Sequence, residues 1–193
     1  MSRRVFFSFH YDDVVNFRAN VVRNSGVVLG SDQAGFFDAS VWETAKRTSD
    51  LAIKRLINQA LENTSVTCVL IGSETYNRHW VRYEILKSIE RGNGILGVHI
   101  NGIKDKYGQT TVQGKNPFSY LKLSPQDQYS INRHVALELN GLTWKKWDGL
   151  SFNFYQRINE TLSNLYPVYD WIIDNGTSNF ANWIERAAKA AGR

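Results

Sequence analysis

An aromatic residue and a carboxylate stand four residues apart in the segment from Trp80 to Glu84. If this segment opens a helix, the two side chains share one face. A tryptophan beside a carboxylate at the ends of strands would desolvate the carboxylate and offer a flat surface to a ligand ring. Spacing alone favours another interpretation, in which Glu84 pairs with Lys87 or Arg91 on a solvated face and Trp80 packs in the core.

The elements that would position these residues alternate between strands and helices. Apolar runs typical of buried parallel strands occupy 5–9, 66–71 and 94–100, with a shorter run near 26–29. Apolar residues at helical spacing predict helices over 14–24, 49–61 and 80–91. This alternation predicts an α/β fold, a flavodoxin-like doubly wound parallel sheet, in which ligands bind beyond the carboxyl ends of the strands.

The second half of the chain has a different pattern. Asn140-Gly141 between two alternating segments predicts a β-hairpin. Residues 166–173 predict one more strand, and apolar residues from Phe180 to Ala187 predict a final amphipathic helix. We therefore expect an α/β domain over residues 1–120 and a C-terminal extension over residues 121–193 that packs on the same domain.

Composition and charge exclude several classes of protein. A chain of 193 residues suits one hydrophobic core. The net charge of +5 is carried by scattered basic residues, so we expect no nucleic-acid partner. No apolar run reaches the length of about 18 residues that a membrane span needs. The single cysteine, Cys68, excludes an intrachain disulfide and predicts a reducing, cytoplasmic compartment.

Two glycine-rich segments resemble phosphate-binding motifs but fail on context. The run from Gly92 to Gly97 has the dinucleotide-binding pattern, yet it lies between a predicted helix and a predicted strand, the reverse of the order that the motif needs. The run from Gly108 to Lys115 has too many residues between its glycines for a phosphate loop. The four histidines show no metal-ligand spacing. We expect no metal and no cofactor.

Several segments, taken in order, resemble a Toll/interleukin-1 receptor (TIR) domain. The first strand reads Val-Phe-Phe-Ser-Phe-His over residues 5–10 and is followed by acidic residues, and Ser73, Tyr76, Trp80 and Glu84 follow a later strand. The chain is most similar to the TIR proteins of the bacterial Thoeris anti-phage defence system. That likeness also includes Phe-Asp-Ala-Ser at 37–40 and the Tyr-Asp-Trp segment at 169–171.

The resemblance implies that Glu84 is the catalytic residue of an enzyme that cleaves NAD+. The glycosidic bond to nicotinamide breaks through an oxocarbenium-like state, which one ionised carboxylate near the ribose can stabilise. Nicotinamide leaves as a neutral ring, so a second, acidic carboxyl is not needed. We expect Glu84 to be ionised at neutral pH, with Arg82 or the helix N-terminus keeping it so. NAD+ is then a substrate, not a cofactor.

The other candidate site residues lie near the ends of strands or in the turns that follow them. As substrate-binding residues we name Phe6, Ser8, His10, Tyr11, Asp38, Ser73, Tyr76 and Trp80. The alternative for Phe6 is core packing, and the alternative for Ser8 is capping of a turn. Ser73 and Tyr76 have the same ambiguity, and Asp38 is first of all a candidate cap.

Two functions of different classes remain open at this point. One is an NAD+-cleaving enzyme of the TIR type that makes a cyclic ADP-ribose isomer. The other is a non-catalytic TIR module that assembles with other proteins. The resemblance implies a phage-derived trigger, self-association through TIR contacts and a separate, ThsA-like effector that senses the nucleotide. A chain of this length has no room for its own effector domain.

Overall fold

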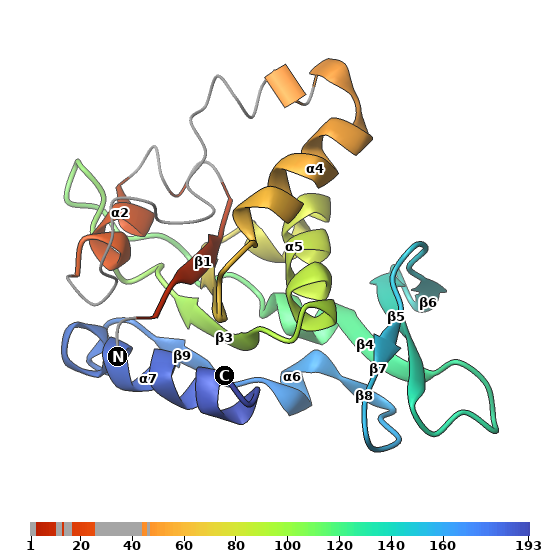
Figure 1. Ribbon diagram of the computed structural model, residues 1–193. Coiled ribbons are helices and arrows are strands. Elements are labelled where there is room, and N and C mark those ends of the chain that lie inside the picture. Colours follow the sequence, from red (N-terminus) through yellow and green to blue (C-terminus); the bar gives the residue numbers. More distant parts are fainter. Residues whose placement is uncertain (1–2, 11–12, 14–16, 26–43, 46) are drawn as a thin grey trace.

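The computed structural model describes residues 3–10, 13, 17–25, 44–45 and 47–193. Four parallel strands form its central sheet, in the order β1-β2-β3-β9 (Figure 1). They are β1 (Val5–Ser8), β2 (Val66–Ile71), β3 (Gly94–His99) and β9 (Val168–Asp170). Every residue of β1 and β2 is buried, which is why both read as continuous apolar runs. The strand expected near 26–29 lies outside the described residues.

Helices cover both faces of this sheet. The longer ones are α2 (Arg18–Arg23), α4 (Asp50–Ala60), α5 (His79–Glu90) and α7 (Gly176–Ala190), and the short ones are η1 (Thr75–Asn77), η2 (Pro117–Tyr120) and α6 (Leu162–Leu165). α4 and α5 share one core layer, and α2 and α7 share the other. The doubly wound α/β class is confirmed.

Part of the first predicted helix, over 14–24, lies in the described residues. There the structure has α2 from Arg18 to Arg23, while residues 14–16 lie outside the described residues. Phe17, just before α2, has a positive φ of 65°, a backbone conformation outside the helical region. α4 agrees more closely, because the Ser49 hydroxyl accepts a hydrogen bond from the Ala52 N–H and caps the helix.

A second, antiparallel sheet packs beside α5. Its strands are β4 (Leu121–Pro125), β5 (Arg133–Asn140), β6 (Thr143–Lys146), β7 (Phe152–Asn153) and β8 (Glu160–Thr161). The predicted hairpin is confirmed, but its turn is displaced by one residue. Asn140 pairs with Thr143, so the loop residues are Gly141 and Leu142, with Gly141 at a φ of 63°.

The chain then returns to the parallel sheet. β9 pairs with β3, and α7 lies so close to β3 that a Cβ atom at Gly94 would collide with the backbone of Ala187. Gly92, at a φ of 74°, ends the turn after α5, so the glycine-rich run here is a turn and a strand, as expected. The expected C-terminal extension therefore contains an antiparallel sheet and a strand and helix that complete the α/β layers.

Two negative findings concern the described part of the chain. None of its helices combines the length and the apolar character needed to cross a membrane. Within the same residues, no group of three or more His, Cys, Asp or Glu side chains is placed to hold a metal ion.

Candidate active site

The last residue of β1 contacts the second turn of α5. The Ser8 hydroxyl donates a hydrogen bond of 2.5 Å to Oε2 of Glu84. Ser8 is fully buried and Glu84 is 6% exposed. The parallel strands place the carboxyl end of β1 at the edge where ligands bind in this fold class. The structure thus joins two of the expected site residues, which lie 76 positions apart in the sequence.

Burial changes the protonation of Glu84. Removal of the carboxyl from water raises its pKa to about 8, although the hydrogen bond from Ser8 acts in the opposite direction. The expectation that Glu84 is ionised at neutral pH is therefore wrong for the isolated protein. A neutral carboxyl is the major form at pH 7, and ionisation requires a higher pH or a nearby positive charge.

Arg82 does not supply that positive charge. Two residues along a helix differ by about 200° in direction, so Arg82 and Glu84 point to opposite sides of α5. Arg82 donates to the carbonyl oxygen of Tyr76 and forms an ion pair of 3.3 Å with Glu138 on β5. The solvated alternative for Glu84 is wrong as well, because Lys87 pairs with Glu90.

Two glycine residues, Gly72 and Gly114, pack closely at the carboxyl end of β2, the strand next to β1. A Cβ atom at Gly72 would collide with the carboxylate of the buried Asp13. A Cβ atom at Gly114 would collide in turn with the carbonyl oxygen of Gly72. Segments that follow β1, β2 and β3 therefore meet at Gly72. Ligands bind beyond the carboxyl ends of the strands in doubly wound sheets, so this meeting point lies at the edge where a ligand is expected.

Tyr76, in η1, contacts residues that follow β3. Its ring is 5.3 Å from the ring of Tyr120, and the Lys115 ammonium lies 5.4 Å from its centre. The Arg82 guanidinium lies over the same Tyr120 ring. The role of Tyr76 in substrate binding stays a prediction. Ser73 is half-buried in the turn after β2, where Gly114 packs against it.

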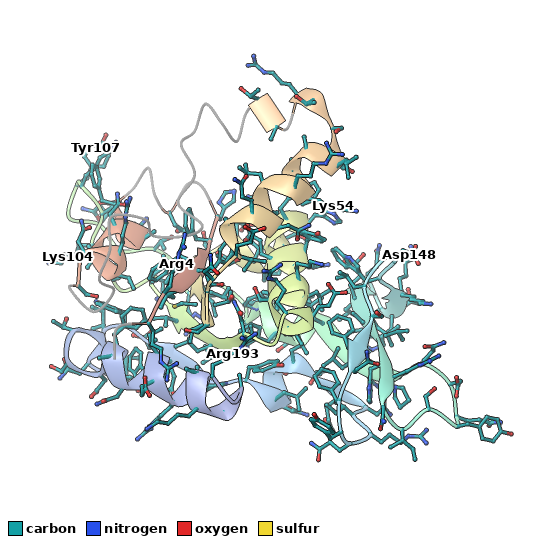
Figure 2. All side chains as sticks on the ribbon, in the orientation of Figure 1. Arg4, Lys54, Lys104, Tyr107, Asp148 and Arg193 are labelled. Carbon is teal, nitrogen blue, oxygen red and sulfur yellow. The ribbon has the colours of Figure 1, made fainter. Side chains whose placement is uncertain are left out.

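Trp80 is partly buried and packs against the core with the Tyr83 ring at 5.9 Å. Figure 2 shows Lys54 on α4, and its ammonium lies 5.6 Å from the centre of that Tyr83 ring. The core interpretation of Trp80 is thus the one that the structure favours. Phe6 is fully buried in the same core layer, as its alternative predicted.

Three further candidates have more limited placements. His10 is half-buried, and its carbonyl oxygen accepts the N–H of Asp13 in the turn after β1. Tyr11 and Asp38 lie outside the described residues, so their roles stay predictions. Of the eight expected substrate-binding residues, Ser8 forms a hydrogen bond to Glu84 in the described structure.

Comparison with known proteins identifies the family of this chain. The family model described as Thoeris protein ThsB, TIR-like domain, matches residues 6–105, which include most of β1 and all of β2, α5 and β3. The chain belongs to the ThsB family. A Bacillus cereus (strain MSX-D12) relative, named "Putative cyclic ADP-D-ribose synthase ThsB1", is 53% identical over 196 aligned positions, which cover 95% of this chain and 100% of the relative.

Within this ThsB-family domain, sequence analysis missed Thr67 and Ser88, which hold the turn of α5 that carries Glu84. The Ser88 hydroxyl donates to the carbonyl oxygen of Glu84 at 2.6 Å and accepts from the Thr67 hydroxyl at 2.8 Å. These contacts tie the turn of α5 that carries Glu84 to the neighbouring strand β2. The spacing of four residues between Glu84 and Ser88 was a usable signal, because a helical serine can bond the carbonyl four residues before it.

The buried carboxyl also gives a stability prediction. The folded-state pKa of Glu84 lies above its unfolded value, so folding favours the protonated form. The contribution of Glu84 to the free energy of unfolding is then fully present below pH 4.5 and is lost as the pH rises to about 8. Glu84→Gln removes the charge and should raise the melting temperature at pH 9 by roughly 5–10 °C. At pH 5 we expect almost no difference, and an equal shift at both pH values in differential scanning calorimetry would contradict this account.

Proposed function

We propose that this protein cleaves NAD+ at the nicotinamide glycosidic bond and closes the remaining ADP-ribose into a cyclic isomer that acts as a signal. The observation that carries the proposal is the buried Ser8–Glu84 pair at the carboxyl end of β1. The name of the Bacillus cereus relative describes a product of the same class, which supports the proposed reaction.

The chemistry needs one carboxylate beside the ribose. As the bond from C1′ to the ring nitrogen breaks, its electron pair goes to nicotinamide and positive charge develops on the ribose. The Glu84 carboxylate stabilises that charge, and its burial strengthens the interaction because little water screens it. Ser8 and Ser88 hold the carboxyl and its helix turn in place before the substrate arrives.

The substrate can itself ionise Glu84. The nicotinamide ring of NAD+ is positively charged, and an opposite charge within about 4–6 Å favours a carboxylate. Binding of NAD+ therefore lowers the pKa of Glu84 from its value of about 8 in the free protein. Glu84 is then neutral in the free protein and ionised when NAD+ is bound.

Cyclisation follows if an internal hydroxyl reaches C1′ before water does. The new bond joins this hydroxyl oxygen to C1′, and the hydroxyl proton goes to the Glu84 carboxylate and then to solvent. A hydroxyl held near C1′ has a high effective concentration, and a closed crevice excludes the competing water. The convergence of three backbone segments at Gly72 supports such a closed crevice.

The signal must act on another protein. The defensive output is assigned to a separate, ThsA-like effector, because the family of this chain belongs to the Thoeris system. A phage-derived trigger and self-association are proposed to activate the enzyme, and the cytoplasm is its proposed compartment. Cys68 takes no part, because burial raises the pKa of its thiol and leaves it unreactive.

A scaffold function explains the site less well. A buried carboxyl that contacts a neutral hydroxyl lowers the stability of the folded protein as it ionises. An interaction module gains nothing from such a group. Its presence at the ligand-binding edge of the sheet favours catalysis.

The products test the proposal directly. Purified full-length protein, alone or clustered on affinity beads, is incubated with NAD+, and the protein-free filtrate is analysed by mass spectrometry. We expect free nicotinamide and a nucleotide lighter than ADP-ribose by one water, with the higher rate in the clustered sample. Nicotinamide with linear ADP-ribose alone would overturn cyclisation, and intact NAD+ in both samples would overturn the proposal.

A further inference from the structure

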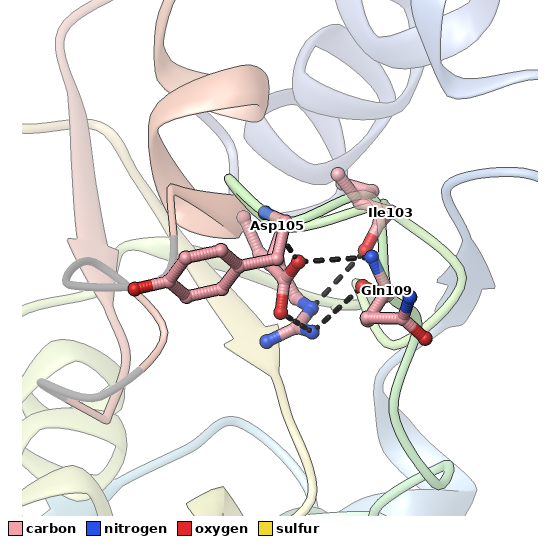
Figure 3. A network of polar contacts seen from close by, with 5 residues as sticks. Ile103, Asp105 and Gln109 are labelled. Atoms are coloured by element: carbon pink, nitrogen blue, oxygen red, sulfur yellow. Dashed lines mark hydrogen bonds and ion pairs between the residues drawn. The ribbon is translucent and has the colours of Figure 1, made fainter.

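An arginine on α2 binds the loop that follows β3. Arg18 is only 5% exposed, and its Nε donates to the carbonyl oxygen of Ile103 at 3.1 Å. Its Nη2 donates to the carbonyl oxygen of Gln109 at 3.0 Å and to the Asp105 carboxylate at 3.1 Å (Figure 3). One buried cation thus satisfies two backbone carbonyls and one carboxylate of the same loop.

The Asp105 carboxylate organises the rest of this loop. Its Oδ1 accepts the N–H groups of Tyr107 and Gln109, each at 2.9 Å, and the Asp105 N–H donates to the carbonyl oxygen of Gln109. Gly108 completes the turn at a φ of 77°. Tyr107 itself extends away from the protein and is 74% exposed (Figure 2). The loop is therefore a compact unit that Arg18 attaches to α2.

This loop crosses the ligand-binding edge of the sheet. Ile103 packs in the core layer of α2 and α7, whereas Phe118, just beyond the loop, packs in the layer of α4 and α5. Between them, Gly114 packs on Gly72 at the carboxyl end of β2. The loop over residues 100–116 therefore passes from one face of the sheet to the other across the carboxyl end of β2, the strand that pairs with β1 through Val69 and Ser8.

The segment before Arg18 is also held in an unusual conformation. Phe17 has a φ of 65°, which is rare for a bulky side chain, and it is half-exposed. Such conformations persist only where neighbouring contacts enforce them, and they concentrate around functional sites. The contacts of Arg18, the next residue, are of that enforcing kind.

We propose that Arg18 is a positioning residue for the NAD+ site, because it fixes the loop over residues 100–116 across the carboxyl ends of β1 and β2. This inference rests on the proposed function. The hydrogen bonds of Arg18 go to the loop and not to Ser8 or Glu84, so it acts through the loop. In this proposal the loop borders the bound dinucleotide, so its position determines how tightly NAD+ is held beside Glu84.

Loss of the arginine should weaken binding more than chemistry. Arg18→Met keeps much of the side-chain volume and removes the donors to Ile103, Asp105 and Gln109. We expect the KM for NAD+ to rise roughly tenfold while kcat changes less than about threefold, because the Ser8–Glu84 pair stays intact. Asp105→Asn keeps the loop fold and weakens the ion pair, so its KM should rise in the same direction by a smaller factor.

The matched control is another arginine in an ion pair. Arg3, just before β1, donates to both carboxylate oxygens of Glu185 on α7, each at 3.0 Å. Arg3→Met removes a pair of similar geometry at the amino end of β1, away from the crevice. We expect both of its kinetic parameters to match those of the unmodified protein.

Limited trypsin digestion gives a readout that does not depend on activity. Trypsin can cleave the bond after Lys106, which lies in the organised loop of the unmodified protein. We expect trypsin to cleave this bond several times faster in Arg18→Met, with the fragments identified by mass spectrometry. Saturating NAD+ should slow that cleavage. Unchanged trypsin cleavage in Arg18→Met would show that the loop does not depend on Arg18 and would overturn the inference.

The kinetic outcomes distinguish a failure of the proposed function from a failure of the positioning role of Arg18. If the unmodified protein releases no nicotinamide, the proposed function fails. If it is active and both Arg18→Met and Asp105→Asn keep its KM, the positioning role of Arg18 fails while the proposed function stands. Should Arg18→Met lack a cooperative melting transition, Asp105→Asn decides the question, since a normal KM in that folded variant would overturn the inference.

Discussion

Glu84→Gln is expected to reduce nicotinamide release from NAD+ by roughly 100- to 1,000-fold. The substitution keeps the size of the side chain and a hydrogen bond to Ser8, but it removes the negative charge that stabilises the ribose cation. The Gln side chain is neutral at every pH, so the positive charge of nicotinamide cannot ionise it. The loss should therefore appear in kcat, measured by chromatography of released nicotinamide.

Glu90→Gln is the matched control for this experiment. Glu90 lies on the same helix and pairs with Lys87, away from Ser8. We expect its activity to match that of the unmodified protein. NAD+ binding to Glu84→Gln should persist in calorimetry, because the carboxylate acts mainly after the substrate has bound. Normal nicotinamide release by folded Glu84→Gln would remove Glu84 from the mechanism.

The pH dependence of NAD+ cleavage should reveal the buried carboxyl. The value of kcat/KM reports ionisation of the free protein, and burial raises the pKa of Glu84 to about 8 there. We therefore expect kcat/KM to rise about tenfold per pH unit up to that pKa and to level off above it. The value of kcat should level off at a lower pH, because bound NAD+ favours the carboxylate.

Ser8→Ala tests the origin of that profile. The Ser8 hydroxyl donates to the charged form of Glu84 and so lowers its pKa. Its removal should move the midpoint of kcat/KM to a higher pH. The control is Ser124→Ala, which removes a hydroxyl on β4 that donates to Asn159. This variant should leave the midpoint of the kcat/KM profile at the same pH. A kcat/KM that is constant between pH 6 and pH 9 would contradict an ionising Glu84.

Local patterns determined most of the secondary structure, whereas the resemblance to TIR domains, and not spacing alone, pointed to Glu84. The apolar run at 66–71 became β2, and the helical spacing at 80–91 became α5, because burial on one or both faces imposes these periodicities on any sequence. The hairpin was also predictable, although its loop shifted by one residue to Gly141 and Leu142. Cross-strand pairing, which sets such a register, depends on contacts that a local pattern does not contain.

Tertiary structure alone decided how the site is arranged. Ser8 was a candidate ligand contact or turn cap from the sequence, and only the packing of α5 on β1 placed its hydroxyl on Glu84. The same packing removed water from that carboxyl and raised its pKa, reversing the expected charge at neutral pH. It also paired Arg82 with Glu138 on the antiparallel sheet. Desolvation and pairing depend on segments far apart in the chain, so residue types and spacing do not determine them.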